Sequence, residues 1–312
     1  MRRGGLVAFP TETVYGLGAD AFNEQAVRKV FEAKGRPPDN PVIVHVSEID
    51  QFLQIGKDIP PSATVLAETF WPGPLTLVVR HRAQLPDAVT AGLPTVAVRM
   101  PDHPVALALI EALSRGIIGP SANISGRPSP TTAKHVMDDL NGKVEIILDG
   151  GATRIGVEST VLDLTSNPPA ILRLGGLPHE AIRKVIGKIS EPTLDALRRS
   201  PGTRYRHYAP RAQVILLPMG DAKFFEDLIV RLRRDGKKAG CILHSLSISA
   251  AGPKGAGDLT VVRKRAEEYA SALYFTMRDF DDRAVDVILV ESIPEVGVGE
   301  AVMDRLRRAA EM

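Results

Sequence analysis

The sequence predicts an α/β protein built from two domains. Its 312 residues are enough for two domains that each bury a sizeable core. Segments rich in β-branched residues alternate with segments of helical periodicity, a pattern typical of a sheet covered by helices. This alternation breaks after Lys188 and restarts near residue 213. We therefore expect a larger domain at residues 1–188, a linker at 189–212 and a smaller domain at 213–312.

The larger domain is expected to contain a mixed sheet. Its predicted strands are short apolar runs, at residues 6–9, 42–46, 75–80, 95–99, 117–119, 144–148, 159–164 and 170–173. Its predicted helices lie at residues 23–33, 61–70, 104–114, 132–140 and 178–186. Asn23 suits the N-cap of the first helix, and Gly142 suits a helix stop. Only a short turn separates the last two strands, so they should pair antiparallel.

The segment after Lys188 has no clean period and carries many turn residues. From Arg198 to Arg211 it holds five arginines and no carboxylate. We interpret it as an extended linker. Beyond it, strands and helices alternate at residues 214–217, 222–234, 240–243, 265–279, 285–290 and 299–309. That order predicts a small Rossmann-like parallel sheet with helices on its faces.

Composition excludes several classes of protein. The net charge of +2 argues against a protein that coats nucleic acid by charge alone, although a local basic patch stays open. The single cysteine, Cys241, lies in an apolar run and is expected in the core, and no Cys/His cluster has zinc-ligand spacing. The apolar run at residues 6–9 is too short for a signal peptide. No run reaches the roughly 18 apolar residues of a membrane span, so we expect a cytoplasmic protein.

The usual glycine-rich phosphate motifs are absent. The chain has no P-loop sequence, and "GLGADA" at Gly16 and "GVGEAV" at Gly297 lack the third glycine of a dinucleotide fingerprint. We expect these glycines to serve turns. If a nucleotide binds, side chains must hold its phosphates.

Lys34 and Arg36 are the first candidates for that task. They stand just before two prolines in "FEAKGRPPDNPVIVHV". Because a residue before proline is pushed to the extended region, both cations should project from one face. An arginine fork and a mobile lysine charge suit a triphosphate. The alternative is a solvated loop after a helix whose last turn favours cations.

Two polar loops are further candidates. In "FPTETVYGLGAD" the hydroxyls of Thr11, Thr13 and Tyr15 would share a face if the stretch is extended, and it follows a strand, where ligands of α/β sheets lie. In "GPSANISGRPSP" serines and an asparagine could wrap an adenosine phosphate. An ordinary turn and an ordinary Pro/Gly loop are the alternatives. Single candidates at strand ends are His45, Arg99, Ser159, Thr160 and Arg173.

Together these segments resemble a known family. The motifs "PTETVYGLGADA", "KGRPPDNPVIVHV", "WPGPLTLVV", "TVAVRMPDHP", "GPSANISGRPSPT", "GVESTVLDL" and "RLGG" occur in the order seen in YrdC-type threonylcarbamoyl-AMP synthases. The linker "PGTRYRHYAP" and the small domain after it resemble the long, two-domain form. The resemblance covers nearly the whole chain and implies a YrdC-like twisted mixed sheet in the first domain. Family members usually carry extra residues ahead of the first strand, which begins here a few residues after Met1.

The resemblance implies an activity. Family members are nucleotidyltransferases that condense L-threonine, bicarbonate and ATP to threonylcarbamoyl-adenylate and pyrophosphate, with Mg²⁺ on the ATP phosphates. A tRNA-modifying threonylcarbamoyl transferase then passes the group to an adenosine of tRNA. Bicarbonate, ATP, L-threonine and that transferase are therefore the expected partners, together with a local RNA contact; no membrane is expected.

The resemblance also assigns residues. It implies that Lys34 and Arg36 are catalytic and bind the ATP phosphates. Further nucleotide contacts are implied at Asn40, Thr95, Ser121, Asn123, Ser129, Arg173, Tyr208 and Ala209. The implied threonine contacts are Thr13, His45, Arg99, Gly119 and Ser159, with Arg99 pairing with the substrate carboxylate. No metal ligand is assigned to the chain.

Two alternatives stay open on the sequence alone. One is a double-stranded RNA or tRNA binding module without catalysis, motivated by the arginine-rich linker. The other is a carbamoyl-adenylate-forming enzyme of the hydrogenase-maturation type. The long linker and the absence of zinc-finger cysteines argue against this second alternative.

Overall fold

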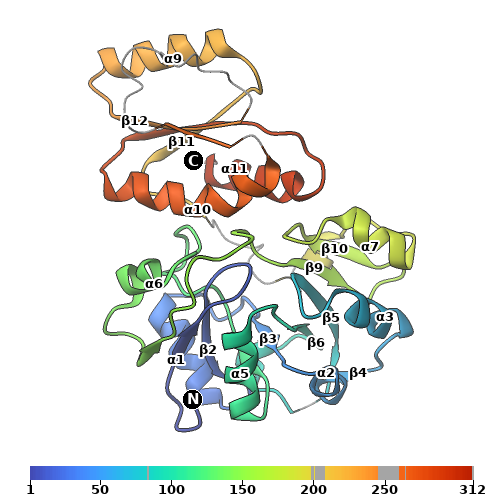
Figure 1. Ribbon diagram of the computed structural model, residues 1–312. Helices are drawn as coiled ribbons and strands as arrows, with labels where there is room; N and C mark the ends of the chain where they lie inside the picture. The colour runs from blue at the N-terminus through green and yellow to red at the C-terminus, as the bar shows by residue number, and fades with distance from the viewer. Residues whose placement is uncertain (83, 198–199, 201–207, 245–259, 264, 311–312) are drawn as a thin grey trace. The chain divides into compact units, whose positions relative to one another are not determined.

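The computed structural model describes residues 1–82, 84–197, 200, 208–244, 260–263 and 265–310. The chain divides into two compact units, Met1–Ser125 with Ser129–Tyr205, and Gly126–Pro128 with Arg206–Met312. Both are α/β, as predicted (Figure 1). Among the helices of these described ranges, none is long and apolar enough to span a membrane.

The first unit is built on a mixed sheet with the strand order β10-β9-β5-β6-β3-β7-β2-β1-β8, and β4 pairs with β5 at the side. Its strands are β1 (Val7–Phe9), β2 (Gly16–Asp20), β3 (Ile43–His45), β4 (Gly56–Lys57), β5 (Leu75–His81), β6 (Thr95–Arg99), β7 (Ile117–Ile118), β8 (Ile146–Ile147), β9 (Thr160–Asp163) and β10 (Ala170–Arg173). Parallel pairs such as β3 with β6 stand beside antiparallel pairs such as β5 with β6. The predicted antiparallel pairing of β9 with β10 is confirmed.

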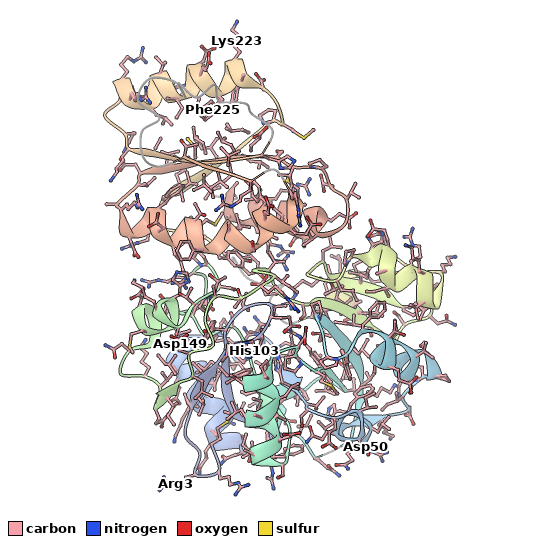
Figure 2. The ribbon with its side chains drawn as sticks, in the orientation of Figure 1. Arg3, Asp50, His103, Asp149, Lys223 and Phe225 are labelled. Atoms are coloured by element: carbon pink, nitrogen blue, oxygen red, sulfur yellow. The ribbon has the colours of Figure 1, made fainter. Side chains whose placement is uncertain are left out.

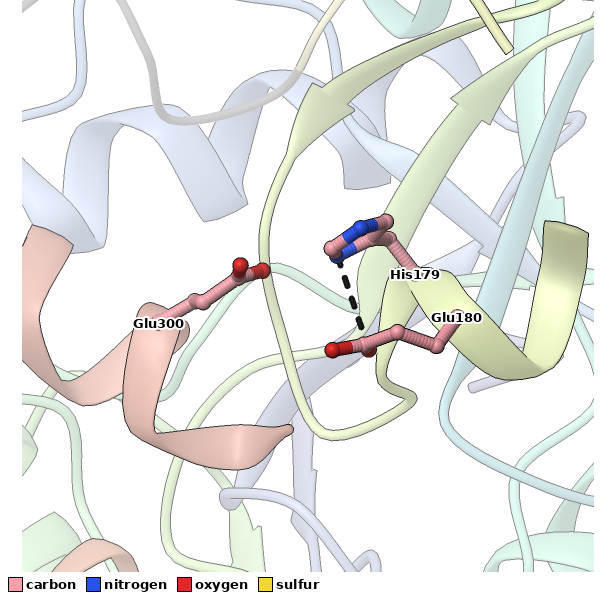
Figure 3. Close-up of side chains that lie close together, drawn as sticks. All are labelled: His179, Glu180 and Glu300. Carbon is pink, nitrogen blue, oxygen red and sulfur yellow. Dashed lines mark ion pairs between the residues drawn. The ribbon is translucent and has the colours of Figure 1, made fainter. Parts of the chain in front are cut away.

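The first unit contains the five predicted helices and three short helices that were not predicted, at Ile49–Ile55, Asp87–Thr90 and Leu194–Leu197. They are α1 (Glu24–Lys34), α2 (Ile49–Ile55), α3 (Pro61–Phe70), α4 (Asp87–Thr90), α5 (Pro104–Leu113), α6 (Ala133–Leu140), α7 (His179–Ile186) and α8 (Leu194–Leu197). Asn23 caps α1 by accepting from the Ala26 amide, as expected. At the start of α7, His179 Nδ1 lies 3.5 Å from Glu180 Oε2, a partly exposed pair that contributes little to stability (Figure 3).

Strand β2 corrects the reading of "GLGADA" as a turn. Gly16 and Gly18 lie inside this strand, which pairs antiparallel with β1. A Cβ on Gly16 would come within 2.7 Å of the Phe9 ring, and one on Gly18 within 2.9 Å of the Val7 carbonyl. These glycines therefore permit close approach of β1 and β2. Gly297 does have a positive φ of 61°, as turn chemistry requires.

The core of the first unit lies on both faces of the sheet. One face belongs to the main cluster, which includes Val44 on β3, Leu77 on β5 and Val98 on β6. All three residues of β1 are buried. The opposite face holds a smaller cluster of Ile43, Val78, Ala97, Val161, Ala170, Leu172 and Ala196. Within the predicted linker, Leu194–Leu197 form the short helix α8 instead of an extended segment, and its Ala196 belongs to this cluster. Residues 198–199 and 201–207 of the linker lie outside the described residues.

The second unit contains a wholly parallel sheet, β11-β14-β12-β13, in agreement with the prediction. Its strands are β11 (Gln213–Leu217), β12 (Ala239–Leu243), β13 (Thr260–Val262) and β14 (Val287–Glu291), and its helices are α9 (Ala222–Arg234), α10 (Ala266–Asp282) and α11 (Val298–Ala310). Helix α9 covers one face, and α10 and α11 cover the other (Figure 1). Phe225 lies on the sheet side of α9 and Lys223 on its outer side (Figure 2). Cys241 is buried under α9, and burial raises the pKa of its thiol to about 12, so it is a core residue.

Candidate active site

The face of the first sheet that carries the smaller core cluster also carries polar side chains. In a strand, residues two apart point to the same face. His45 therefore shares a face with Ile43 on β3, and Thr95 and Arg99 share one with Ala97 on β6. Thr76 shares it with Val78 on β5. These four polar residues are buried, and the smaller cluster is thus the apolar floor of a polar region.

Three loops over this region are joined by backbone hydrogen bonds. The Ala122 amide donates to the Tyr15 carbonyl over 2.8 Å, and the Tyr15 amide donates to the Pro130 carbonyl over 2.9 Å. The Ile155 amide donates to the Glu12 carbonyl over 2.8 Å. The segments 10–15, 119–125, 129–131 and 151–159 are therefore joined to one another, although they are far apart in the sequence.

Lys34 lies at the end of α1, and its ammonium binds the loop 119–131. Its Nζ donates to the carbonyls of Ser121, over 2.5 Å, and Asn123, over 2.6 Å, and the residue is 2% exposed. Gly35, with a φ of 59°, follows in the left-handed conformation. The prediction that Lys34 and Arg36 share one face of an extended stretch is therefore wrong: a helix end and a left-handed residue separate them.

Arg36 is held by its own loop. Its Nε donates to the Asn40 carbonyl over 3.2 Å, and its Nη2 donates to the Pro41 carbonyl over 2.8 Å. The guanidinium carbon lies 5.8 Å from the centre of the Phe31 ring, and Arg36 helps to line a cavity of about 520 Å³. Asn40 is fully buried beside it. These contacts hold the Arg36 guanidinium in place, but they do not show what it binds.

The loop after β1 bends instead of extending. The hydroxyls of Thr11 and Thr13 lie 2.8 Å apart, and Thr11 also accepts from the amides of Thr13 and Val14. Tyr15 does not join them, because its hydroxyl donates to the Gly151 carbonyl over 2.7 Å. The prediction that the three hydroxyls share one face is therefore wrong for Tyr15. The hydroxyls of Thr11 and Thr13 do contact each other.

Arg99 forms a buried ion pair with Glu12, a residue that the sequence analysis missed. Arg99 Nη2 lies 2.7 Å from Glu12 Oε1, and Arg99 Nε donates to the Gly73 carbonyl over 3.1 Å. The side chains are 4% and 2% exposed. The one signal in the sequence is the carboxylate between two threonines in "PTET".

His45 lies next to Arg99 across the pair β3 and β6. Burial, assisted by the positive charge of Arg99, lowers the pKa of His45 to about 3, so the imidazole is neutral near pH 7. Its Nδ1 has no hydrogen-bond partner within the described part of the chain. A Cβ on Gly119 would lie 2.7 Å from the ring, so glycine lets this backbone approach the histidine. A neutral ring nitrogen, an arginine and a close backbone are thus brought together.

Ser159 is the centre of a second network. Its hydroxyl lies 2.7 Å from that of Thr76 and accepts from Arg173 Nη2 over 3.1 Å. Arg173 Nη2 also donates to the Ser159 carbonyl over 3.0 Å. The register of β10 against β9 shifts between Ile171 and Arg173, just before this side chain. Thr76 was not predicted, because one hydroxyl in an apolar strand gives no signal of its own.

The remaining predicted residues are less connected. Ser129 donates to Glu158 Oε1 over 2.6 Å, and both are buried; Glu158 was not predicted. Thr95 is buried at the start of β6, four residues from Arg99, or roughly 13 Å along the strand. Tyr208 and Ala209 belong to the second unit. There the Tyr208 ring stacks on Tyr274 at 5.6 Å.

Comparisons with known proteins identify the family of this chain. The Sua5–YciO–YrdC family model, described as telomere recombination, matches residues 1–175. A second model, described as the C-terminal domain of threonylcarbamoyl-AMP synthase, matches residues 177–311. The threonylcarbamoyl-AMP synthase of Pyrococcus abyssi is 51% identical over 99% of this chain and 92% of its own length. That of Bacillus subtilis is 46% identical over 99% of this chain and 90% of its own length.

Solved structures give the same result. The crystal structure of Pyrococcus abyssi Sua5 complexed with L-threonine superposes with a TM-score of 0.91 at 50% sequence identity, over 99% of this chain and 91% of that one. Escherichia coli YciO, at 24% identity and a TM-score of 0.51 over 56% of this chain and 84% of its own, shares the fold of the first unit. The enzyme interpretation therefore holds over the RNA-binding alternative, and the chain belongs to the threonylcarbamoyl-AMP synthase family in its two-domain form.

Proposed function

We propose that this chain condenses L-threonine, bicarbonate and ATP to threonylcarbamoyl-adenylate, with the residues described above as its site. The assignment of residues is carried by a buried set of side chains: Arg99 and His45 lie side by side on β6 and β3, Thr13 is buried, and Arg173 binds the buried Ser159. It offers a fixed cation for a carboxylate, a neutral ring nitrogen, and hydroxyls for a hydroxylated side chain.

The threonine half of the site centres on Arg99. An arginine binds a carboxylate through two parallel hydrogen bonds, which fixes the orientation of the amino acid. Thr13, His45, Ser159 and the backbone of Gly119 complete this half. Because His45 stays neutral near pH 7, its ring can accept a hydrogen bond without adding a charge.

The nucleotide half comprises Lys34, Arg36, Asn40, Thr95, Ser121, Asn123, Ser129 and Arg173. Arg36 is preorganised by two carbonyls, so it reaches a developing phosphate charge at little cost in reorganisation. Lys34 fixes the loop that carries Ser121 and Asn123. Preorganised positive charge is the main requirement of catalysis at a phosphorus atom.

Mg²⁺ enters as the magnesium complex of ATP. Glu12 is paired with Arg99, and Glu158 accepts a hydrogen bond from Ser129, so the nearby carboxylates are committed to protein partners. Mg²⁺ commonly takes its oxygen ligands from substrate phosphates and water. We therefore assign the ion to the phosphates of ATP and no ligand to the chain.

The reaction needs two bond-forming steps. The threonine amine attacks the carbon of bicarbonate, and water leaves as the carbamate forms. A carbamate oxygen then attacks the α-phosphorus of ATP, and pyrophosphate leaves. Arg99 orients the amino acid, and Arg36 and Arg173 offset charge on the phosphates. The mixed anhydride product suits a downstream transferase that modifies tRNA.

Pyrophosphate release tests this function. It is measured with threonine, with serine and without an amino acid, each with and without bicarbonate. We expect full release only when threonine and bicarbonate are both present. Equal release when threonine or bicarbonate is left out would contradict the proposal. Salt-sensitive RNA binding without pyrophosphate release would instead support an RNA-binding module without catalysis.

A further inference from the structure

The Glu12–Arg99 pair is costly to bury. Each charge is removed from water, and a buried ion pair often adds little net stability to a fold. Removing one partner nevertheless leaves the other charge buried and uncompensated. A pair of this kind, located at the end of a strand in a polar region, is therefore better explained by the orientation that it imposes than by stability.

The pair is held by charge and not by an aligned fork. Arg99 Nη2 and Glu12 Oε1 are 2.7 Å apart, yet this Nη2 and both Glu12 oxygens lack an aligned hydrogen bond with any described residue. The other anchor of the guanidinium is the carbonyl of Gly73, which accepts from Nε. Arg99 is thus fixed by one carbonyl and one carboxylate and keeps donor capacity for a ligand.

The backbone around Glu12 is also fixed. The Glu12 carbonyl accepts from the Ile155 amide over 2.8 Å. On either side of it, the Thr11 hydroxyl donates to the Val14 carbonyl over 2.6 Å and accepts from the Thr13 amide over 3.1 Å. The loop therefore presents the carboxylate to Arg99 from a rigid turn, which is what a positioning role requires.

We propose that Glu12 is a positioning residue that holds the Arg99 guanidinium ready for the carboxylate of the amino acid substrate. The proposal rests on the proposed function. Without the charge of Glu12, the guanidinium is anchored only at Gly73, and threonine must bind an arginine that has first to be oriented. The consequence falls on threonine and not on ATP.

The test substitutes Glu12→Gln, which keeps the shape and removes the charge. The Michaelis constants for threonine and ATP are measured by pyrophosphate release. We expect the threonine KM to rise at least tenfold and the ATP KM to stay within twofold. Glu12→Asp keeps the charge on a shorter side chain and should recover part of the loss.

Glu145→Gln is the matched control. Glu145 accepts from the Leu6 amide over 2.6 Å, before β1, whereas Glu12 follows β1. The same chemical change there removes a carboxylate charge without touching Arg99, and the glutamine oxygen can still accept from the Leu6 amide. Both Michaelis constants of this variant should stay within twofold of wild type.

A double-mutant cycle tests whether Glu12 acts through Arg99. Glu12→Gln raises the threonine KM by some factor in the wild type and by another factor in an Arg99→Lys background. We expect the factor in the Arg99→Lys background to be at least five times smaller. A merely structural role predicts equal factors in both backgrounds, with parallel rises in the KM of ATP.

Three results would overturn the proposal. They are an unchanged threonine KM in Glu12→Gln, equal rises in both Michaelis constants, and additive effects in the cycle. If Glu12→Gln does not fold, the same criteria apply to Glu12→Asp. A wild-type chain without threonine-dependent release would overturn the proposed function and this inference together, whereas the three results above overturn only the inference.

Discussion

At the scale of single residues, buried polar groups near the smaller core cluster bond to one another. Thr76 and Ser159 share a hydrogen bond, Arg173 binds Ser159, and Glu12 pairs with Arg99. Arg99, Ser159 and Arg173 are the side chains that the proposed function assigns to substrates. Glu12 and Thr76 restrict the movement of Arg99 and Ser159. Two single-residue predictions follow from this arrangement.

His45 should make the stability of the protein depend on pH. The pKa of its imidazole is lowered from 6.5 to about 3 in the folded protein. Between pH 6.5 and 3 the unfolded chain binds a proton on His45 that the folded chain does not bind. The stability that comes from a neutral His45 is therefore fully present above pH 6.5 and is lost as pH falls. Wild type should therefore lose about 2 kcal/mol more than His45→Asn between pH 6.5 and 4.5. Urea unfolding at both values measures this, and equal losses would contradict the account.

Thr76→Val should loosen Ser159 while keeping the shape of the side chain. The variant removes a fully buried hydroxyl bond, so we expect a loss of about 1 kcal/mol in the free energy of unfolding. Through Ser159 it should also weaken threonine binding severalfold. Calorimetric titration and urea unfolding measure both. Thr69→Val, on the exposed side of α3, is the control and should change neither quantity.

At the scale of elements, glycines set how closely segments approach. Gly175, in the predicted "RLGG" motif, lies against the backbone that carries Ser159. Gly16 and Gly18 likewise let strands β1 and β2 lie close together. The resemblance placed these motifs, but their physical role is visible only when the neighbouring strand is known.

Gly175→Ala should therefore displace the segment that carries Ser159. The new Cβ would lie 2.3 Å from the Ser159 carbonyl carbon and the Thr160 amide nitrogen, where neither backbone atom can give way easily. We expect a loss of about 1–3 kcal/mol in the free energy of unfolding and a fall in activity. Gly5→Ala is the control, since its nearest contact is 3.5 Å from a Glu145 side chain. Thermal unfolding of both compares them, and a neutral Gly175→Ala would refute the packing argument.

At the scale of the whole molecule, the sequence predicts the order of the elements better than the contacts between them. The helices at 61–70 and 222–234 are as expected, because periodicity and caps are local signals. Strand β2 was missed because its glycines mimic a turn, and their reason lies in the opposing strand.

The same limit applies to the site. Thr13, His45, Arg99, Ser159 and Arg173 were named through the family motifs, and all five are buried; His45 lies beside Arg99, and Arg173 binds Ser159. Glu12, Thr76 and Glu158 were missed, because each is recognisable only by the partner that the fold brings to it: Arg99, Ser159 and Ser129. The proposed shared face for Lys34 and Arg36 failed for the same reason, since Lys34 turns to the carbonyls of Ser121 and Asn123.

The central claim is that one region of the first unit binds threonine through Arg99 and the ATP phosphates through Arg36. Calorimetric titration of each ligand alone into wild type, Arg99→Lys and Arg36→Ala tests it most directly. Arg99→Lys should weaken threonine about tenfold or more and leave ATP unchanged, because lysine lacks the fork that holds a carboxylate. Arg36→Ala should weaken ATP by about 1.5–3 kcal/mol and leave threonine unchanged. If both variants weakened both ligands equally, or neither ligand at all, the claim would be contradicted.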